Sequence, residues 1–114
     1  MNYFTKLALY PIFVILNLYP GLIAADLNAG KEKAEGVCAG CHGNDGVNGI
    51  MPSYPIIAGQ HEDYLLQALT DYKSGSRKNA VMAGIASTLT KEDIINLSAY
   101  FSQLPGPLYL KKRQ

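Results

Sequence analysis

The chain has 114 residues, of which 48% are hydrophobic and 17% are charged, and its formal net charge is +1. This length fits one domain, and the near-balanced charge excludes a typical nucleic-acid-binding protein. The apolar content excludes a disordered chain, and two cysteines are too few for a disulfide-dense scaffold.

Residues 1–25 have the layout of a secretory signal peptide. One lysine precedes a long apolar run, Pro20-Gly21 interrupts this run, and Ala24-Ala25 supplies small residues for cleavage. The alternative is an uncleaved membrane anchor, because the run approaches the roughly 20 residues that span a bilayer. The helix-breaking Pro-Gly pair favours cleavage. We therefore predict an exported protein.

The chain that follows this leader is expected to begin with a helix and a long loop. Residues 26–37 contain helix formers, and Gly30, Ala34 and Val37 share one face that is suited to close helix packing. Residues 38–59 are rich in Gly, Pro and Asn, which is typical of loops. A loop of this length in a compact domain usually has a functional reason.

The clearest helix is predicted over residues 60–74, and Gly75 is suited to end it. One apolar stripe runs along this helix with the spacing i, i+1, i+4, i+5 and i+8, and it consists of Tyr64, Leu65, Ala68, Leu69 and Tyr72. A polar loop, SRKN, then leads to the apolar segment VMAGIASTL.

The last predicted helix begins after Thr90, which is a favourable N-cap, and Asp93 occupies the capping-box position. Its inner face is expected to consist of Ile94, Leu97, Ser98, Phe101 and Leu104. Pro105-Gly106-Pro107 ends it. Because no segment has the period of a strand, the predicted fold class is all-α, with three or four helices and long loops.

The segment Cys38-Ala39-Gly40-Cys41-His42 is a C-x-x-C-H sequence, the signature of covalent c-type haem attachment. The two thiols add across the two haem vinyl groups as thioethers, and the adjacent His42 then lies beneath the iron as an axial ligand. The small residues between the cysteines let the backbone approach the porphyrin edge. A haem would also supply the extra core that so small a domain requires.

Three other kinds of site use part of this motif. A thioredoxin-like redox pair is expected in a βαβ context, which this sequence lacks, and a structural disulfide does not require the histidine. A zinc site would draw on Cys38, Cys41, His42 and His61, but two adjacent ligands would strain the tetrahedral geometry. Haem attachment outside the cytoplasm agrees with the leader and predicts a periplasmic protein.

The sixth iron ligand decides between an electron carrier and a catalyst, and the candidates are Met51, His61 and Met82. Met82 lies beyond the predicted 60–74 helix, which is about 22 Å long at 1.5 Å per residue, so the chain can return to the opposite face of the haem. Met51 would have to skirt the ring almost fully stretched, and His61 stands at a solvated helix start. We therefore predict Met82, and His/Met ligation favours ferrous iron.

These residues resemble the class I c-type cytochromes, most closely one haem domain of the cytochrome c4/c553 group. The resemblance runs from about Gly30 to Leu104 through GVCAGCHGNDG, YPIIAGQHEDYLLQAL, YKSGSRKNAVM and LTKEDIINLSAYFSQL. Gly30 and Tyr100 match the family's contact between the first and last helices. Cytochromes c4 carry two such domains, whereas this sequence has one motif. The resemblance implies a mono-haem domain at 26–104. A short basic tail is predicted at 105–114, and it has no counterpart in the family.

The same resemblance implies the roles of individual residues. Cys38 and Cys41 would hold one haem c covalently, and His42 and Met82 would be the axial ligands of its iron. Pro55 would offer its carbonyl to the His42 ring N–H, a bond that orients the ring and raises its basicity.

The implied function is one-electron transfer between redox protein partners, without a small-molecule substrate or an enzymatic activity of its own. Nucleic acid is not an expected partner, and a membrane is one only if the leader stays uncleaved. The alternative is a haem-bearing subunit of a larger oxidoreductase, and a peroxidase-like cytochrome would need a vacant sixth position. Lys73, Arg77 and Lys78 could form a docking rim, although solvation of a loop also explains them.

Overall fold

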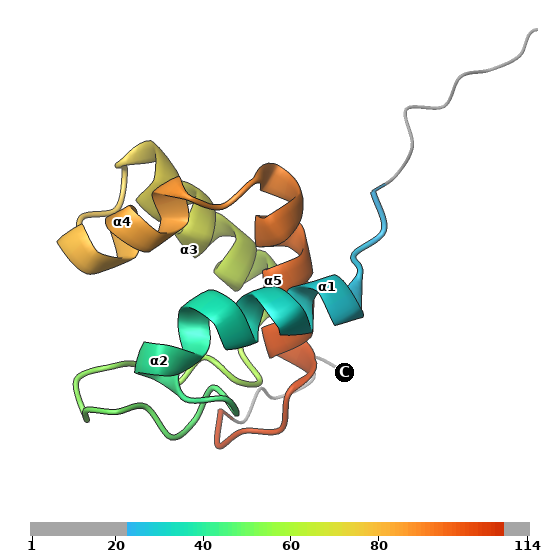
Figure 1. Ribbon diagram of the computed structural model, residues 1–114, viewed down its shortest axis with the longest axis vertical. Helices are drawn as coiled ribbons and strands as arrows, with labels where there is room; N and C mark the ends of the chain where they lie inside the picture. Colours follow the sequence, from blue (N-terminus) through green and yellow to red (C-terminus); the bar gives the residue numbers. More distant parts are fainter. Residues whose placement is uncertain (1–22, 109–114) are drawn as a thin grey trace, which may run out of the picture.

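The computed structural model describes residues 23–108 of the chain. The predicted leader at 1–25 therefore lies almost entirely outside the described residues, as does most of the predicted tail at 105–114. Within residues 23–108 the secondary structure is helical and without strands, which confirms the all-α class. The elements in chain order (Figure 1) are α1 (Leu27–Lys33), the π-helical turn η1 (Ala34–Cys38), α2 (Ala39–His42), α3 (Glu62–Ser74), α4 (Ala80–Ser87) and α5 (Lys91–Gln103).

The first three elements form one continuous helical segment that ends at His42. The prediction of a loop from residue 38 onward is therefore wrong at its beginning, because the C-x-x-C-H motif is itself helical. Residues 39 and 40 are small and fit a helix, and the chain leaves it only at Gly43, whose φ of 81° suits glycine. None of the helices among the described residues is long and apolar enough to cross a membrane.

The two later helices that the sequence predicted are present, although α3 begins two residues later than predicted, at Glu62. Helix α3 ends at Gly75, which adopts the left-handed conformation with a φ of 82°. At the start of α5, the Thr90 hydroxyl accepts from the Asp93 N–H at 3.0 Å, and the Asp93 carboxylate accepts from the Thr90 N–H at 2.8 Å. These bonds, together with Lys33 at 3.2 Å, lower the pKa of Asp93. The predicted capping box is therefore confirmed.

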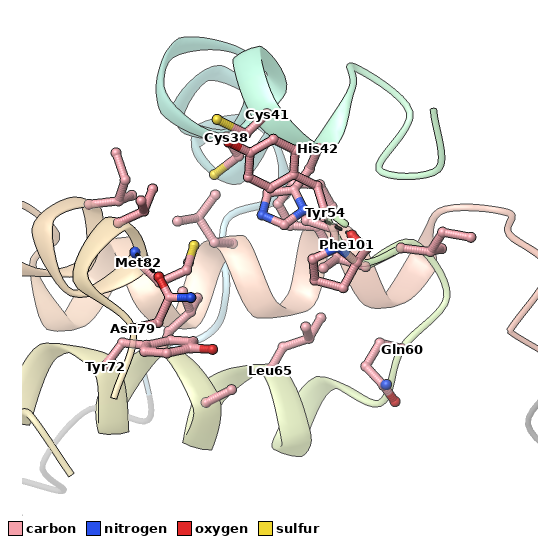
Figure 2. Close-up of a pocket in the computed structure, with 18 of the residues that line it drawn as sticks. Cys38, Cys41, His42, Tyr54, Gln60, Leu65, Tyr72, Asn79, Met82 and Phe101 are labelled. Atoms are coloured by element: carbon pink, nitrogen blue, oxygen red, sulfur yellow. Dashed lines mark hydrogen bonds between the residues drawn. The ribbon is translucent and has the colours of Figure 1, made fainter. Parts of the chain in front are cut away.

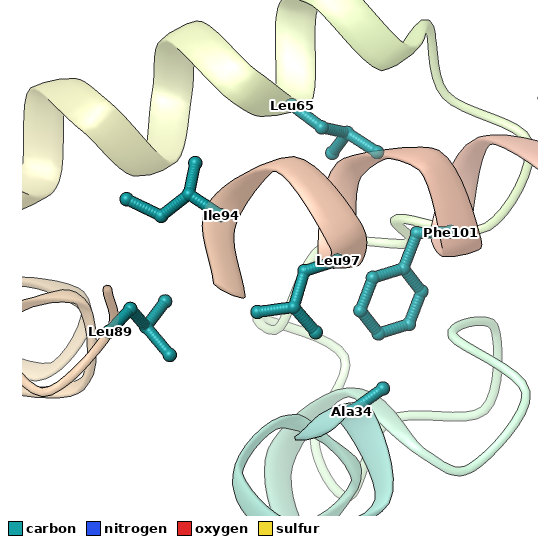
Figure 3. Close-up of a cluster of buried hydrophobic side chains, with 6 residues drawn as sticks. All are labelled: Ala34, Leu65, Leu89, Ile94, Leu97 and Phe101. Carbon is teal, nitrogen blue, oxygen red and sulfur yellow. The ribbon is translucent and has the colours of Figure 1, made fainter. Parts of the chain in front are cut away.

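Among the described residues the hydrophobic core is small, and its members come from η1, α3, α5 and the turn that follows α4 (Figure 3). Its buried members are Ala34, Leu65, Leu89, Ile94, Leu97 and Phe101. Four of the five residues predicted for the inner face of α5 are buried, whereas Leu104, just beyond the end of the helix, is only partly buried. So few buried side chains leave a domain of this size dependent on additional core material.

Helix α1 crosses α5 at very short range (Figure 1). A Cβ atom added to Gly30 would lie 2.9 Å from the Tyr100 Cβ and closer still to the Asn96 carbonyl, so only glycine fits. The predicted contact between Gly30 and Tyr100 is therefore confirmed. The buried Asn96, which the sequence did not reveal, accepts from the Asp26 N–H at 2.8 Å and ties the start of α1 to α5.

We expect Gly30→Ala to lower the free energy of unfolding by about 2 kcal/mol, because the added methyl group meets backbone that cannot move aside. Gly36→Ala is the matched control, since open space surrounds its Cβ position and alanine favours helix. Urea unfolding followed by circular dichroism measures both variants. Equal stabilities of the two variants would contradict the close helix crossing.

Candidate functional site

A cavity of about 540 Å³ lies between the segment that ends in α2, the loop that follows it, and helices α3 and α4 (Figure 2). This volume is within the range of about 300–1,000 Å³ that is typical of small-molecule sites. All five residues of the predicted α3 stripe line it, and only Leu65 among them is buried. The stripe therefore forms one wall of the cavity.

The two cysteines lie beside this cavity and are not bonded to each other. The π-helical turn η1 ends at Cys38, and the Ala39 N–H bonds back to the Ala34 carbonyl five residues earlier. Such wide turns inside helices are frequent at functional sites. Here η1 sets the orientation of α2, the next helical turn, which carries Cys41 at the edge of the cavity.

Burial, with a smaller contribution from Cys41, raises the pKa of Cys38 to about 11. The free Cys38 thiol is therefore protonated near neutral pH. Reactive cysteines of redox enzymes have the opposite property, a lowered pKa that maintains a thiolate. Together with the absence of strands from residues 23–108, this pKa argues against a thioredoxin-like pair.

The ring of His42 is buried, and a single hydrogen bond determines its orientation. Its Nδ1 lies 2.9 Å from the carbonyl oxygen of Pro55. Because a carbonyl oxygen can only accept, Nδ1 donates this hydrogen bond, and Nε2 takes no part in it. Figure 2 shows the His42 ring at the cavity, with Tyr54 edge-on at a centroid distance of 6.1 Å. The structure therefore brings Pro55 and His42 together in the way that the resemblance implied.

Met82 approaches the cavity from a different element, helix α4, and its side chain faces His42 across the cavity (Figure 2). No helix was predicted over this apolar segment. The sequence signal for it is Asn79, an N-cap residue immediately before the apolar run. Its side-chain oxygen accepts from the Met82 N–H at 3.0 Å.

The structure also separates the other two candidates for the sixth ligand. His61 is exposed at the start of α3 and does not line the cavity. Met51 does line it, but the neighbouring Ile50 N–H bonds to the Cys41 carbonyl at 3.1 Å, so this loop lies on the side of α2. Met82 is therefore the candidate on the side opposite His42.

The described residues contain no group of three or more His, Cys, Asp or Glu side chains that could hold a metal ion. The zinc alternative, which required Cys38, Cys41, His42 and His61 together, therefore finds no support. The donor set at the cavity is instead an imidazole nitrogen, the thioether sulfurs of Met51 and Met82, and two thiols, surrounded mainly by apolar side chains. These residues fit an iron porphyrin attached through both thiols.

Two of the three cations of the hypothetical docking rim are engaged within the domain. The Lys73 ammonium donates to the carbonyl of Ser87, the last residue of α4, at 3.3 Å and to the Leu89 carbonyl just beyond it at 2.6 Å. The Arg77 guanidinium lies 5.0 Å from the centre of the Tyr72 ring. These internal contacts account for Lys73 and Arg77 without a partner.

Comparison with known proteins gives a consistent result. The cytochrome c family model matches residues 27–105. Cytochrome c4 of Thiocapsa roseopersicina is 41% identical over 80 residues, which are 70% of this chain and 41% of that protein. Cytochrome c-554(548) of Halomonas halodenitrificans is 42% identical over 82 residues, 69% of this chain and 96% of that protein. The chain thus spans less than half of the cytochrome c4 relative and nearly all of the cytochrome c-554(548).

Two further similarities concern a subunit and a solved structure. The cytochrome subunit of sulfide dehydrogenase of Chlorobaculum tepidum is 43% identical over 67 residues, 59% of each chain. The crystal structure of reduced recombinant cytochrome c4 from Pseudomonas stutzeri aligns with a TM-score of 0.63 at 32% identity, covering 71% of this chain and 50% of that one. The fold and the sequence therefore indicate the same family.

We expect the double variant Cys38→Ala/Cys41→Ala to lose all covalently bound haem, because no other thiol exists in the chain to form a thioether. Acid–acetone extraction followed by haem absorbance of the protein fraction measures this loss. Met82→Ala is the control, since it changes the cavity but leaves both thiols in place. Haem that survives extraction in the double variant would contradict the attachment.

Proposed function

The chain belongs to the cytochrome c family, and from this premise we propose that it is an exported, mono-haem electron carrier whose iron is bound by His42 and Met82. One haem c is covalently attached through Cys38 and Cys41 and supplies the one-electron couple of its iron. The observation that carries the proposal is the arrangement of the cavity. His42 and Met82 face each other across it, and both cysteines lie at its edge.

The proposed role of His42 depends on its contact with Pro55. The carbonyl of Pro55 holds the proton at Nδ1, which leaves Nε2 as the ligand atom and increases its basicity. Burial of the ring also prevents water from competing for the same position. The protein thereby keeps the same ligand and the same ring orientation in both oxidation states, so little needs to reorganise when an electron is transferred.

The proposed role of Met82 is to close the sixth position. Its thioether is neutral and soft, so it favours the ferrous state and raises the reduction potential. A closed position leaves no place for oxygen or peroxide, which distinguishes a carrier from a peroxidase-like cytochrome. The electron-carrier role of cytochrome c relatives agrees with this proposal.

The second candidate function is a haem-bearing subunit of a larger oxidoreductase. It is supported by the relative named as the cytochrome subunit of sulfide dehydrogenase. Apolar side chains near the cavity support it too, since Ile50 is 68% exposed, Met51 49% and Val81 56%. In both candidates the partners are redox proteins, and the electron enters and leaves through the same site. Co-purification with a catalytic chain from native extract would favour the subunit over the free carrier.

We expect Met82→Ala to abolish the near-infrared thioether band of the ferric protein and to lower the reduction potential, because the soft sixth ligand is lost. Absorption spectroscopy and redox titration measure the two effects. Met51→Ala is the matched control and is expected to leave both unchanged. A band that is missing from the wild type, or that persists in Met82→Ala, would refute the ligand assignment.

We expect the mature protein to begin near Asp26 and to be recovered from the periplasmic fraction, since residues 1–25 have the layout of a cleaved leader. Intact-mass spectrometry of the haem-containing protein gives the first residue. Recovery of a chain with Met1 intact in the membrane fraction would instead show an anchor.

A further inference from the structure

Helix α4, which carries Met82, has little intrinsic stability. It contains eight residues, one of them Gly84, and only Ala86 among them is buried. Isolated helices shorter than about 12–15 residues are marginal in water, and an internal glycine weakens them further. The placement of Met82 therefore depends on the packing of α4 against α3 and on contacts made at the ends of the helix.

The C-terminal end of α4 is attached to α3 by one side chain. Lys73 of α3 donates to the carbonyl groups of Ser87 and Leu89, at 3.3 Å and 2.6 Å. A cation at this position satisfies free carbonyl groups and complements the negative end of the helix dipole. This contact holds the end of the helix that is remote from Met82.

The N-terminal end is held by Asn79, and here the contact involves the proposed ligand itself. Asn79 is extended, with φ −166° and ψ 117°, and its side-chain oxygen accepts from the backbone N–H of Met82 at 3.0 Å. Its carbonyl accepts from Ala83 at 2.8 Å, the first bond of the helical ladder. The backbone of Met82 is thus fixed by a residue that also lines the cavity.

We infer that Asn79 is a positioning residue for the sixth iron ligand: its cap on the Met82 N–H keeps the first turn of α4 folded and the thioether on the iron. The inference rests on the proposed function, because it takes Met82 as the ligand. Without the cap, the first turn opens more often, and Met82 leaves its position for a larger fraction of the time. The protein would then admit external ligands while keeping its covalent haem.

The test uses ferric holoprotein and imidazole, which can bind the iron only when the sixth position is open. Its apparent affinity is therefore proportional to the open fraction. We expect Asn79→Ala to raise this affinity about fivefold, the population change that corresponds to loss of a typical N-cap. Asn79→Ser, which retains a capping oxygen, is expected to restore the affinity of the wild type. Absorbance titration and the near-infrared thioether band measure the open fraction independently.

Thr90→Ala is the matched control, because it removes the equivalent cap from α5, which carries no proposed ligand. It is expected to destabilise the domain as much as Asn79→Ala does while leaving imidazole binding unchanged. If Asn79→Ala fails to attach haem, Asn79→Gly provides a milder loss of the cap, with an expected increase in affinity of about twofold.

Three results would overturn the inference. An unchanged imidazole affinity in Asn79→Ala, with Met82→Ala binding strongly, would refute the role of the cap and leave the ligand assignment intact. An equal rise in Thr90→Ala would show a general loss of stability. Met82→Ala that binds imidazole no better than the wild type would refute the ligand assignment, and the role of Asn79 would fall with it.

Discussion

The constraint on which this domain depends is the enclosure of a flat apolar ring by a chain that has few core residues of its own. Within residues 23–108, six side chains form the buried hydrophobic cluster, and three of them, Leu65, Leu97 and Phe101, also line the cavity. The hydrophobic core and the cavity therefore share these three side chains. The haem c that the family binds completes the core as well as carrying the electron.

The two proposed axial ligands are held in physically different ways. His42 ends a continuous helical segment, is buried, and has its ring fixed by the Pro55 carbonyl. Met82 belongs to a short helix whose ends are tied by Asn79 and Lys73. The first arrangement combines a long helical segment, burial and one hydrogen bond, whereas the second depends on a few polar bonds at the ends of a short helix. Local stability varies across a fold in this manner, and functional segments are often among the locally less stable parts of a protein.

Charged side chains that the sequence suggested for partner docking instead make contacts within the domain, on the helices that line the cavity. The ammonium of Lys73 caps carbonyl groups at the C-terminal end of α4, and the Arg77 guanidinium lies over the Tyr72 ring. Both stabilise the two helices that face His42 across the cavity. The surface near the cavity therefore offers a redox partner fewer free cations than the sequence suggested. It offers more exposed apolar surface, such as Ile50 and Val81.

The sequence by itself determined the features that depend on neighbouring residues. The attachment motif, the capping box at Thr90 and the helix stop at Gly75 are local patterns, so their chemistry is readable without the fold. The tertiary structure decided what depends on distant segments. It showed that the α3 stripe faces a cavity, and that Asn96 is buried against the start of α1. It also showed that Met82 is held by a capped helix. These features depend on how distant segments pack together, because the burial of a side chain and the direction in which it points are not properties of a single segment.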